Sequence, residues 1–280
     1  MSQKVIITVA PTGSISTKKD NPNLPVTSEE IAAETLRSYN AGASMVHLHA
    51  RDQQTGLPTS DINVFRAYLD AVRSVCPIIT QITTGGGATT LGLTPEERLK
   101  PVEELRPDSA SLNAGSMNFG RRLFPNIPEV MELYARRMKE LGVMPEFEAY
   151  DLSMINNVEH WIRKPGIIDP PYRFSFVMGV VGGIPASPKN LIAMIESTPK
   201  EHSWQVIGIG RHQIPLGTAG VLLGGGCRVG FEDNVYLERG VLAKSNAEIV
   251  ERMAKIIRLL GYEVATLEEA KKMLPLLNKR

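Results

Sequence analysis

The chain has 280 residues, of which 22% are charged and 42% hydrophobic, as in an ordinary globular protein. Its formal net charge of +1 at pH 7 gives no reason to expect nucleic acid or an anionic membrane as a partner. The two cysteines suggest no disulfide framework, and we find neither a signal peptide nor an apolar run of the ~20 residues that a membrane span needs. We therefore expect a cytoplasmic protein.

Strand-like and helix-like segments alternate along the whole chain. The first strand, residues 5–10, reads VIITVA, a continuous apolar run that is typical of a strand buried on both faces. Seven further strands are predicted at residues 44–50, 78–84, 109–114, 147–150, 174–181, 204–209 and 227–231. A helix is predicted after each strand, at residues 28–40, 61–74, from 94, and at 128–141, 154–163, 187–197, 216–223 and 245–261.

Eight consecutive strand–helix pairs predict an α/β protein with a (β/α)8 TIM barrel, formed by residues 1–280 as a single domain. The competing interpretation is an open doubly wound sheet. The C-terminal extension, at about residues 266–280, is expected to be one more helix packed outside or an arm to a neighbouring subunit. In a TIM barrel the functional residues lie at the C-terminal ends of the strands, and this rule selects the candidate residues.

The second predicted strand carries two histidines near its end. His47 and His49 are two residues apart, so in a strand both side chains point to the same side. Two imidazole nitrogens presented from one side suit a divalent metal ion. The alternative is that both rings are satisfied by backbone carbonyl groups.

The third metal ligand has to come from another strand end, because a catalytic zinc site has about three protein ligands. Glu232 is the best-placed carboxylate, at the tip of the eighth strand and near the second strand of a barrel. Glu148, on the fifth strand, is its main rival. A plain salt bridge of Glu232 is the interpretation that needs no metal.

Arg228 and Asp233 lie on either side of that carboxylate in the sequence. An arginine can hold a carboxylate through two parallel hydrogen bonds. An aspartate fixed in this way, near a metal-bound substrate, can accept the proton of a carbon acid. A structural ion pair explains the same two residues equally well.

Polar and glycine residues also follow the third and fourth strands. Thr84, Gly85 and Gly86 belong to a loop whose backbone amides can approach a carboxylate or phosphate, although three successive glycines also fit a simple tight turn. Ser111 and Asn113 lie at the end of the fourth strand. These residues are candidates for binding substrate.

Together, these motifs resemble those of the β-keto acid cleavage enzyme family over essentially the whole chain. The matching segments are HLHARD at 47–52, TTGGG at 83–87, SLNAGSMNFG at 111–120, GIGRHQ at 208–213 and RVGFEDN at 228–234. The resemblance implies a (β/α)8 barrel, commonly a homotetramer, with a divalent metal that is usually zinc. It also implies a reaction of a β-keto acid with acetyl-CoA that gives acetoacetate and a new acyl-CoA.

The resemblance also implies roles for individual residues. It implies metal ligation by His47, His49 and Glu232, and removal of the C2 proton of the substrate by the Arg228–Asp233 dyad. A small hydroxyl position before the glycine loop falls on Thr83, and a threonine position on strand four falls on Ser111. A strand-five glutamate falls on Glu148. The two hydroxyl groups are expected to bind the substrate carboxylate or the developing oxyanion.

One position departs from the family member that acts in lysine fermentation, on 3-keto-5-aminohexanoate. That enzyme has a glutamate after strand one that binds the ammonium group of its substrate, and Ile15 falls at this position here. An isoleucine cannot pair with a cation, and burying an ammonium group beside it is costly. We therefore expect a neutral or apolar β-keto acid as the substrate.

Two other functions remain open at the level of the sequence. A metal-dependent hydrolase can use a strand-borne His-x-His pair on the same barrel, usually with a further His or Lys from strands four to six. A non-catalytic barrel that binds CoA or a keto acid is the second alternative. The presence of both histidines with Arg228, Glu232 and Asp233 favours catalysis.

Overall fold

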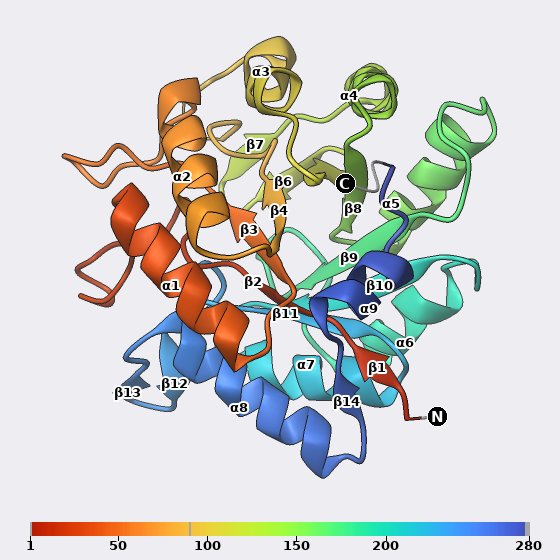
Figure 1. Ribbon diagram of the computed structural model, residues 1–280. Helices are drawn as coiled ribbons and strands as arrows, with labels where there is room; N and C mark the ends of the chain where they lie inside the picture. The colour runs from red at the N-terminus through yellow and green to blue at the C-terminus, as the bar shows by residue number, and fades with distance from the viewer. Residues whose placement is uncertain (1, 90, 278–280) are drawn as a thin grey trace.

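The structure, a computed structural model, describes residues 2–89 and 91–277 (Figure 1). Eight parallel strands close into a barrel in the order β10-β11-β2-β3-β4-β5-β8-β9. This closure confirms the predicted TIM barrel and excludes the open sheet. The barrel strands are β2 (Ile7–Val9), β3 (Met45–Leu48), β4 (Ile79–Ile82), β5 (Ser109–Asn113), β8 (Met144–Ala149), β9 (Arg173–Met178), β10 (Ser203–Gly208) and β11 (Gly226–Val229).

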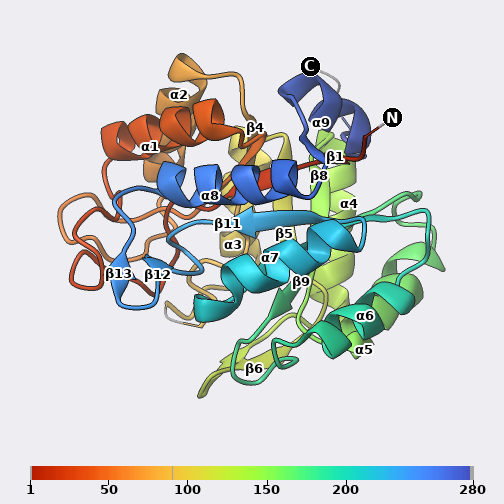
Figure 2. The same ribbon diagram turned by 90° about the horizontal axis from the view of Figure 1, so that it is seen from below.

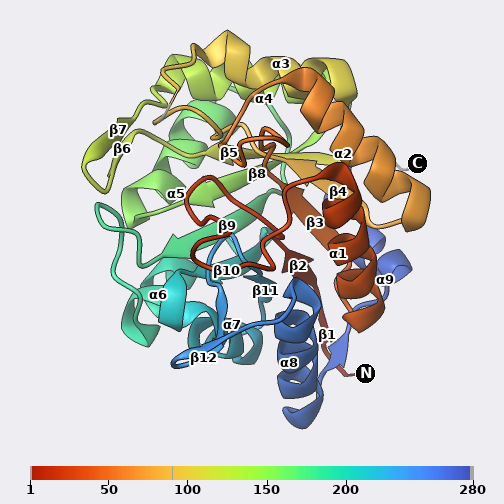
Figure 3. The same ribbon diagram turned by 90° about the vertical axis from the view of Figure 1, so that its left-hand side faces the viewer.

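Helices surround the barrel and bury one face each against it (Figure 1, Figure 3). Two of them begin with a capping box, in which Thr27 and Thr94 each exchange hydrogen bonds with the glutamate three residues later. The outer helices are α1 (Ser28–Ala41), α2 (Ile62–Val75), α3 (Pro95–Leu105), α4 (Pro128–Leu141), α5 (Leu152–Val158), α6 (Pro188–Glu196), α7 (Gln213–Leu222) and α8 (Asn246–Leu259).

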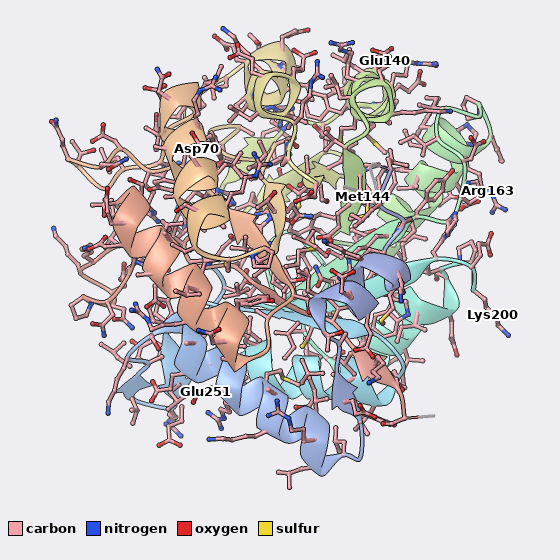
Figure 4. All side chains as sticks on the ribbon, viewed as in Figure 1. Asp70, Glu140, Met144, Arg163, Lys200 and Glu251 are labelled. Atoms are coloured by element: carbon pink, nitrogen blue, oxygen red, sulfur yellow. The ribbon has the colours of Figure 1, made fainter. Side chains whose placement is uncertain are left out.

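Most of the outer helices are amphipathic: their apolar side chains face the barrel and most of their charged side chains face outward. Among the described helices, none is long and apolar enough to cross a lipid bilayer. In Figure 4 the buried Met144 lies near the centre of the view, Glu140, Arg163 and Lys200 lie towards its rim, and Asp70 and Glu251 lie on the outer helices α2 and α8.

The prediction of one continuous first strand at residues 5–10 is wrong. Lys4–Val5 form β1, which pairs with β14 (Glu263–Val264), and the barrel strand β2 begins only at Ile7. The chain divides here because the returning C-terminal segment supplies β1 with a partner outside the barrel. A run of apolar residues predicts that a strand is buried, but it does not predict which other strand pairs with it.

Other differences concern element ends and short additions. The fifth barrel strand begins at Met144 instead of residue 147, and α5 continues as a π-helical turn over Glu159–Arg163. The helix predicted at 216–223 begins at Gln213, after a 3-10 turn over Gly210–His212. Two antiparallel hairpins were not predicted: β6 (Met117–Phe119) with β7 (Arg122–Phe124), and β12 (Tyr236–Glu238) with β13 (Val241–Leu242).

The C-terminal segment lies at the end of the barrel where the strands begin. Helix α9 (Leu267–Met273) lies near β1 and away from hairpin β12–β13 (Figure 2). Ala270 and Leu274 form a small apolar cluster with Ile6, Met45 and Met144 from the barrel. This cluster closes one end of the barrel, so the functional groups gather at the other.

The interior of the barrel between these two ends is polar. Glu146 of β8 and Arg173 of β9 form an ion pair of 2.9 Å in which both side chains are almost fully buried. Ser175 and Gln205 donate hydrogen bonds to the second oxygen of Glu146, at 2.7 and 3.1 Å. Alternate strand residues such as Val46 and Leu48 instead join the apolar core between strands and helices.

Candidate active site

A cavity of about 440 Å³ opens at the C-terminal ends of the strands. Its polar wall contains His49, Glu148, Arg228, Glu232 and Asp233, which come from the ends of three strands, β3, β8 and β11, or the loops after them. Its apolar wall is formed by Phe119, Phe124, Val177, Val180, Val181 and Ile209. The position agrees with the general location of active sites in TIM barrels. A larger hollow of about 770 Å³ lies at the opposite end, beside α9, away from this cluster of charged groups.

The structure brings together the three side chains that the sequence predicts as metal ligands. His47 Nε2 lies 3.6 Å from Glu232 Oε2, and His49 Nε2 lies 3.4 Å from Glu232 Oε1. One ligand atom from each of the three residues lies within 4.8 Å of the others. Glu148, the rival ligand, is not a member of this group of described residues. The arrangement results from strand β3, which turns both histidines to the barrel axis, and from the turn after β11, which carries Glu232.

The donor set fits a divalent cation. The ring nitrogen His47 Nδ1 lies 2.6 Å from Gln81 Oε1, so it carries the proton and leaves Nε2 free as a ligand. Burial lowers the pKa of His47 to about 4, so its ring is neutral at pH 7. Oxygen Oε2 of Glu232 is buried and has no hydrogen-bond partner among the described residues. An unpaired carboxylate oxygen that faces the ring nitrogens of two histidines is a donor set that suits a divalent cation.

Two residues that support this cluster were missed by the sequence analysis. Gln81 interrupts the otherwise apolar or hydroxylated strand IITQIT, and that polar side chain at a buried position was the available signal. Gly13 is packed against Glu232: a Cβ atom at Gly13 would lie 2.4 Å from Glu232 Cγ. The loop after β2 therefore leaves room for the Glu232 side chain only if residue 13 is glycine.

Arg228 organises the carboxylates beside the cluster. Its Nε and Nη2 atoms donate to the two oxygens of Asp233 at 2.9 and 2.7 Å, and Nη2 also donates to Glu232 Oε1 at 2.8 Å. Burial and the charge of Glu232 raise the pKa of Asp233 to about 6, although Arg228 opposes the shift. For Glu232, burial alone would raise the pKa, but Arg228 and the two histidines lower it well below the usual range. Asp233 is therefore the more basic carboxylate of the two.

Glu148 lies on the other side of Arg228. Its Oε1 atom is 3.6 Å from Arg228 Nη1, and the hydroxyl of Tyr150 donates to its Oε2 at 3.2 Å. Burial raises the pKa of Glu148 to about 7, with Arg228 acting in the opposite direction. Arg228 Nη1 itself is buried without a hydrogen-bond partner among the described residues, so it can donate to a molecule in the cavity.

The remaining predicted substrate residues divide into two groups. Ile15, Thr83, Gly85 and Asn113 line the cavity, and Asn113 Nδ2 has no hydrogen-bond partner within the described chain. Thr83 Oγ1 accepts a hydrogen bond from the Gly85 amide at 2.9 Å. The other three, Thr84, Gly86 and Ser111, are not part of the cavity wall as the described residues define it, and the Thr84 hydroxyl donates to the Ser111 carbonyl at 2.7 Å.

Comparison with known proteins gives a consistent result. A family model described as beta-keto acid cleavage enzyme matches residues 4–276. The 3-keto-5-aminohexanoate cleavage enzyme of Fusobacterium nucleatum is 44% identical over 278 residues, which are 99% of each chain. The 3,5-dioxohexanoate:acetyl-CoA acetone transferase of Paraburkholderia graminis is 38% identical over 304 residues, covering 98% of this chain and 96% of the relative.

Solved structures support the fold. Apo ObcA has a TM-score of 0.77 at 21% identity, covering 92% of this chain and 66% of its own. Type I 3-dehydroquinate dehydratase from Clostridium difficile has a TM-score of 0.59 at 11% identity, covering 92% and 93%. These likenesses concern the barrel, whereas the family match concerns nearly every residue of the sequence. The chain belongs to the β-keto acid cleavage enzyme family.

Proposed function

We propose that the protein condenses a β-keto acid with acetyl-CoA and releases acetoacetate and a new acyl-CoA. The observation that carries this proposal is the cluster of His47, His49 and Glu232 beside the Arg228–Asp233 pair in one cavity. Relatives at 38% and 32% identity carry names that include acetyl-CoA, namely a 3-oxoadipate:acetyl-CoA acetyltransferase and a 3-dehydrocarnitine:acetyl-CoA trimethylamine transferase. The proposal extends to a homotetramer in the cytoplasm.

A divalent cation, by preference zinc, would be held by His47, His49 and Glu232, and when bound it supplies a Lewis acid that polarises a ketone oxygen. The residues around it act on the substrate directly. Asp233 takes a proton from C2, the carbon between ketone and carboxylate, and Arg228 keeps the aspartate oriented through its two hydrogen bonds. Arg228 Nη1 and Asn113 Nδ2, both buried and unpaired in the described chain, are donors for substrate oxygens.

The rest of the reaction follows from ordinary carbonyl chemistry. The C2 carbanion attacks the thioester carbonyl of acetyl-CoA, and the C–S bond breaks to release the CoA thiolate. The thiolate then attacks the original ketone of the substrate. Cleavage of the bond between that carbon and C2 gives the new acyl-CoA and acetoacetate, and Asp233 returns its proton to C2. The atoms of the two substrates equal those of the two products, so the reaction consumes neither an oxidant nor water.

The walls of the cavity favour a substrate with a neutral, apolar side chain. Six apolar side chains face the cavity, with the exposed Ile15 at its edge. The carboxylates in its wall, as described, are Glu148, Glu232 and Asp233, and all three contact Arg228. An ammonium group in the substrate would therefore find no carboxylate that is not already paired.

A panel of β-keto acids, assayed for acetoacetate release with acetyl-CoA, tests the proposal. We expect 3-ketohexanoate to give a higher kcat/KM than 3-keto-5-aminohexanoate, and omission of acetyl-CoA to stop turnover. A higher kcat/KM for the amino substrate would refute the proposed side-chain preference. Turnover that is independent of acetyl-CoA would replace the proposed transfer with hydrolysis.

A further inference from the structure

Three segments on one side of the cavity carry positive charge without any acidic residue. They are residues 115–127, which contain hairpin β6–β7, residues 179–190 between β9 and α6, and residues 209–213 after β10. Together they contain Arg121, Arg122, Lys189 and Arg211, and no Asp or Glu. The whole chain has a net charge of only +1, so this local excess is a distinct feature of the molecule.

The three segments form one continuous wall. The amide of Gly120 donates to the carbonyl of Val181 at 2.7 Å, which joins the hairpin to the second segment. A Cβ atom at Gly179 would lie 3.7 Å from the Cβ of Ile209, which joins the second segment to the third. Figure 3, which faces the C-terminal ends of the strands, shows hairpin β6–β7 at upper left and the connection from β9 to α6 below it.

The four cations on this wall have no acidic partner in the part of the chain that the structure describes. All four are exposed, and none forms an ion pair with a described residue. Within the described ranges, the Arg211 side chain donates only to the neighbouring ring nitrogen of His212, at 3.4 Å. On another side of the same face, by contrast, Lys18 is paired with Glu30 at 2.6 Å. Unpaired arginines at the edge of a cavity are suited to bind the phosphate groups of a ligand.

The size of the cavity indicates which part of a phosphate-bearing ligand would lie inside it and which part outside. At about 440 Å³ it lies near the lower end of small-molecule sites, which span roughly 300 to 1,000 Å³. It can hold a keto acid and the thioester end of acetyl-CoA, but the phosphates have to remain outside. Val181 and Leu123 are 77% and 63% exposed beside the arginines, and they offer apolar contact for an uncharged chain that leaves the cavity.

We propose that this basic wall binds the CoA portion of acetyl-CoA, with its diphosphate and ribose phosphate contacting Arg121, Arg122 and Arg211, and Lys189 nearby. The inference rests on the proposed function, since it assumes that acetyl-CoA is the co-substrate. In this proposal the three segments recognise the nucleotide of CoA, and the residues at the strand ends carry out the reaction.

The test compares acetyl-CoA with acetylpantetheine, which presents the same thioester without the nucleotide and its phosphates. We expect Arg211→Gln, and Arg121→Gln with Arg122→Gln, to raise the KM for acetyl-CoA by about 3- to 10-fold. The kcat and the KM for acetylpantetheine should change by less than about 2-fold. Arg239→Gln is the matched control, because Arg239 is exposed, unpaired among the described residues and on hairpin β12–β13, outside the basic wall.

Calorimetric titration with CoA alone adds a measurement that does not depend on turnover. Wild-type affinity should fall as NaCl is raised, and the arginine variants should show a smaller fall. The inference would be overturned if the arginine variants raised the KM for acetyl-CoA and for acetylpantetheine equally, or if Arg239→Gln raised the KM for acetyl-CoA as much as they do. A change in the molecular mass of the variants, measured by light scattering, would also overturn it. If the wild-type enzyme turns over without acetyl-CoA, the proposed function fails. If it needs acetyl-CoA but the variants keep the wild-type KM, the inference alone fails.

Discussion

At the scale of single residues, the metal cluster depends on neighbours that do not themselves bind the ion. Gln81 fixes the tautomer of His47, and Gly13 leaves the space that Glu232 occupies. Such contacts have consequences for metal affinity as large as those of some ligands. Both can be tested with the metal alone, independently of any substrate.

Replacing Gln81 by Leu removes the acceptor of the His47 Nδ1 proton at nearly constant volume. We expect the affinity for Zn²⁺ to fall by about 10- to 100-fold, because the ring is no longer held in one tautomer and orientation. Titration against a competing chelator measures this change. Gln205→Leu is the control, since Gln205 lies in the same polar interior but bonds to Glu146 and Arg173, not to a histidine. Unchanged zinc affinity in the Gln81 variant would show that the contact has no role in metal binding.

A methyl group at Gly13 would collide with Glu232. Because its Cβ would lie 2.4 Å from Cγ and 3.2 Å from the Cα of Glu232, either the loop or the carboxylate has to move. We expect Gly13→Ala to lose most of its zinc binding and at least about 100-fold in kcat/KM, with little change in circular dichroism. Ser14→Ala, at the next position, should keep the zinc affinity of the wild type. Retention of zinc binding by Gly13→Ala would mean that Glu232 is not a required ligand.

At the scale of elements, the elements predicted best are those with a strong local period. In strand β3, Val46 and Leu48 face outward and His47 faces inward. This alternation predicted both the strand and the side on which its functional histidine lies. The hairpins were missed because each strand has only two or three residues and their partners are chosen by tertiary contact. Hairpin β6–β7 nevertheless supplies Phe119 and Phe124 to the cavity. The sequence therefore predicted the polar residues of the candidate site in more detail than its apolar wall.

Arg98 of α3 holds that hairpin in place. Its guanidinium lies 5.5 Å from the ring centroids of both Phe124 and Tyr134, and it donates to the Pro125 carbonyl and to Asn126. We expect Arg98→Met to lower the free energy of unfolding by about 2 to 4 kcal/mol, since buried cation–π and charged hydrogen bonds are lost together. The KM for the keto acid should rise because Phe124 lines the cavity. Denaturant unfolding and steady-state kinetics check the two effects, and a stable variant with unchanged KM contradicts this account.

At the scale of the whole molecule, the barrel has an apolar closure at one end and its chemistry at the other. The C-terminal segment supplies Ala270 and Leu274 to that closure and a partner for β1, so residues more than 250 positions apart in the sequence lie side by side. No local pattern could have predicted this pairing, because β1 and β14 contain two residues each. The eightfold alternation, by contrast, was enough to predict closure of the barrel.

Between the two ends, Glu146 and Arg173 form a buried ion pair whose stabilising effect depends on pH. Burial alone would raise the pKa of Glu146, but the charge of Arg173 and the hydrogen bond from Ser175 lower it below the usual 4.5. A carboxyl group whose pKa is lower in the folded state than in the unfolded state stabilises the fold above the unfolded pKa. That contribution is lost as the pH falls below 4.5 and through the folded value.

Glu146→Gln tests this interior pair. At pH 7 we expect the variant to lose about 3 to 5 kcal/mol in the free energy of unfolding, because Arg173 keeps its charge in a buried position without a counter-charge. As the pH falls below 4.5, the wild type should lose stability more steeply than the variant, so the two curves approach each other. Urea unfolding at a series of pH values from 7 to 3 measures both curves. Parallel curves over that range would mean that Glu146 does not titrate with folding and that the barrel interior is held by its neutral hydrogen bonds.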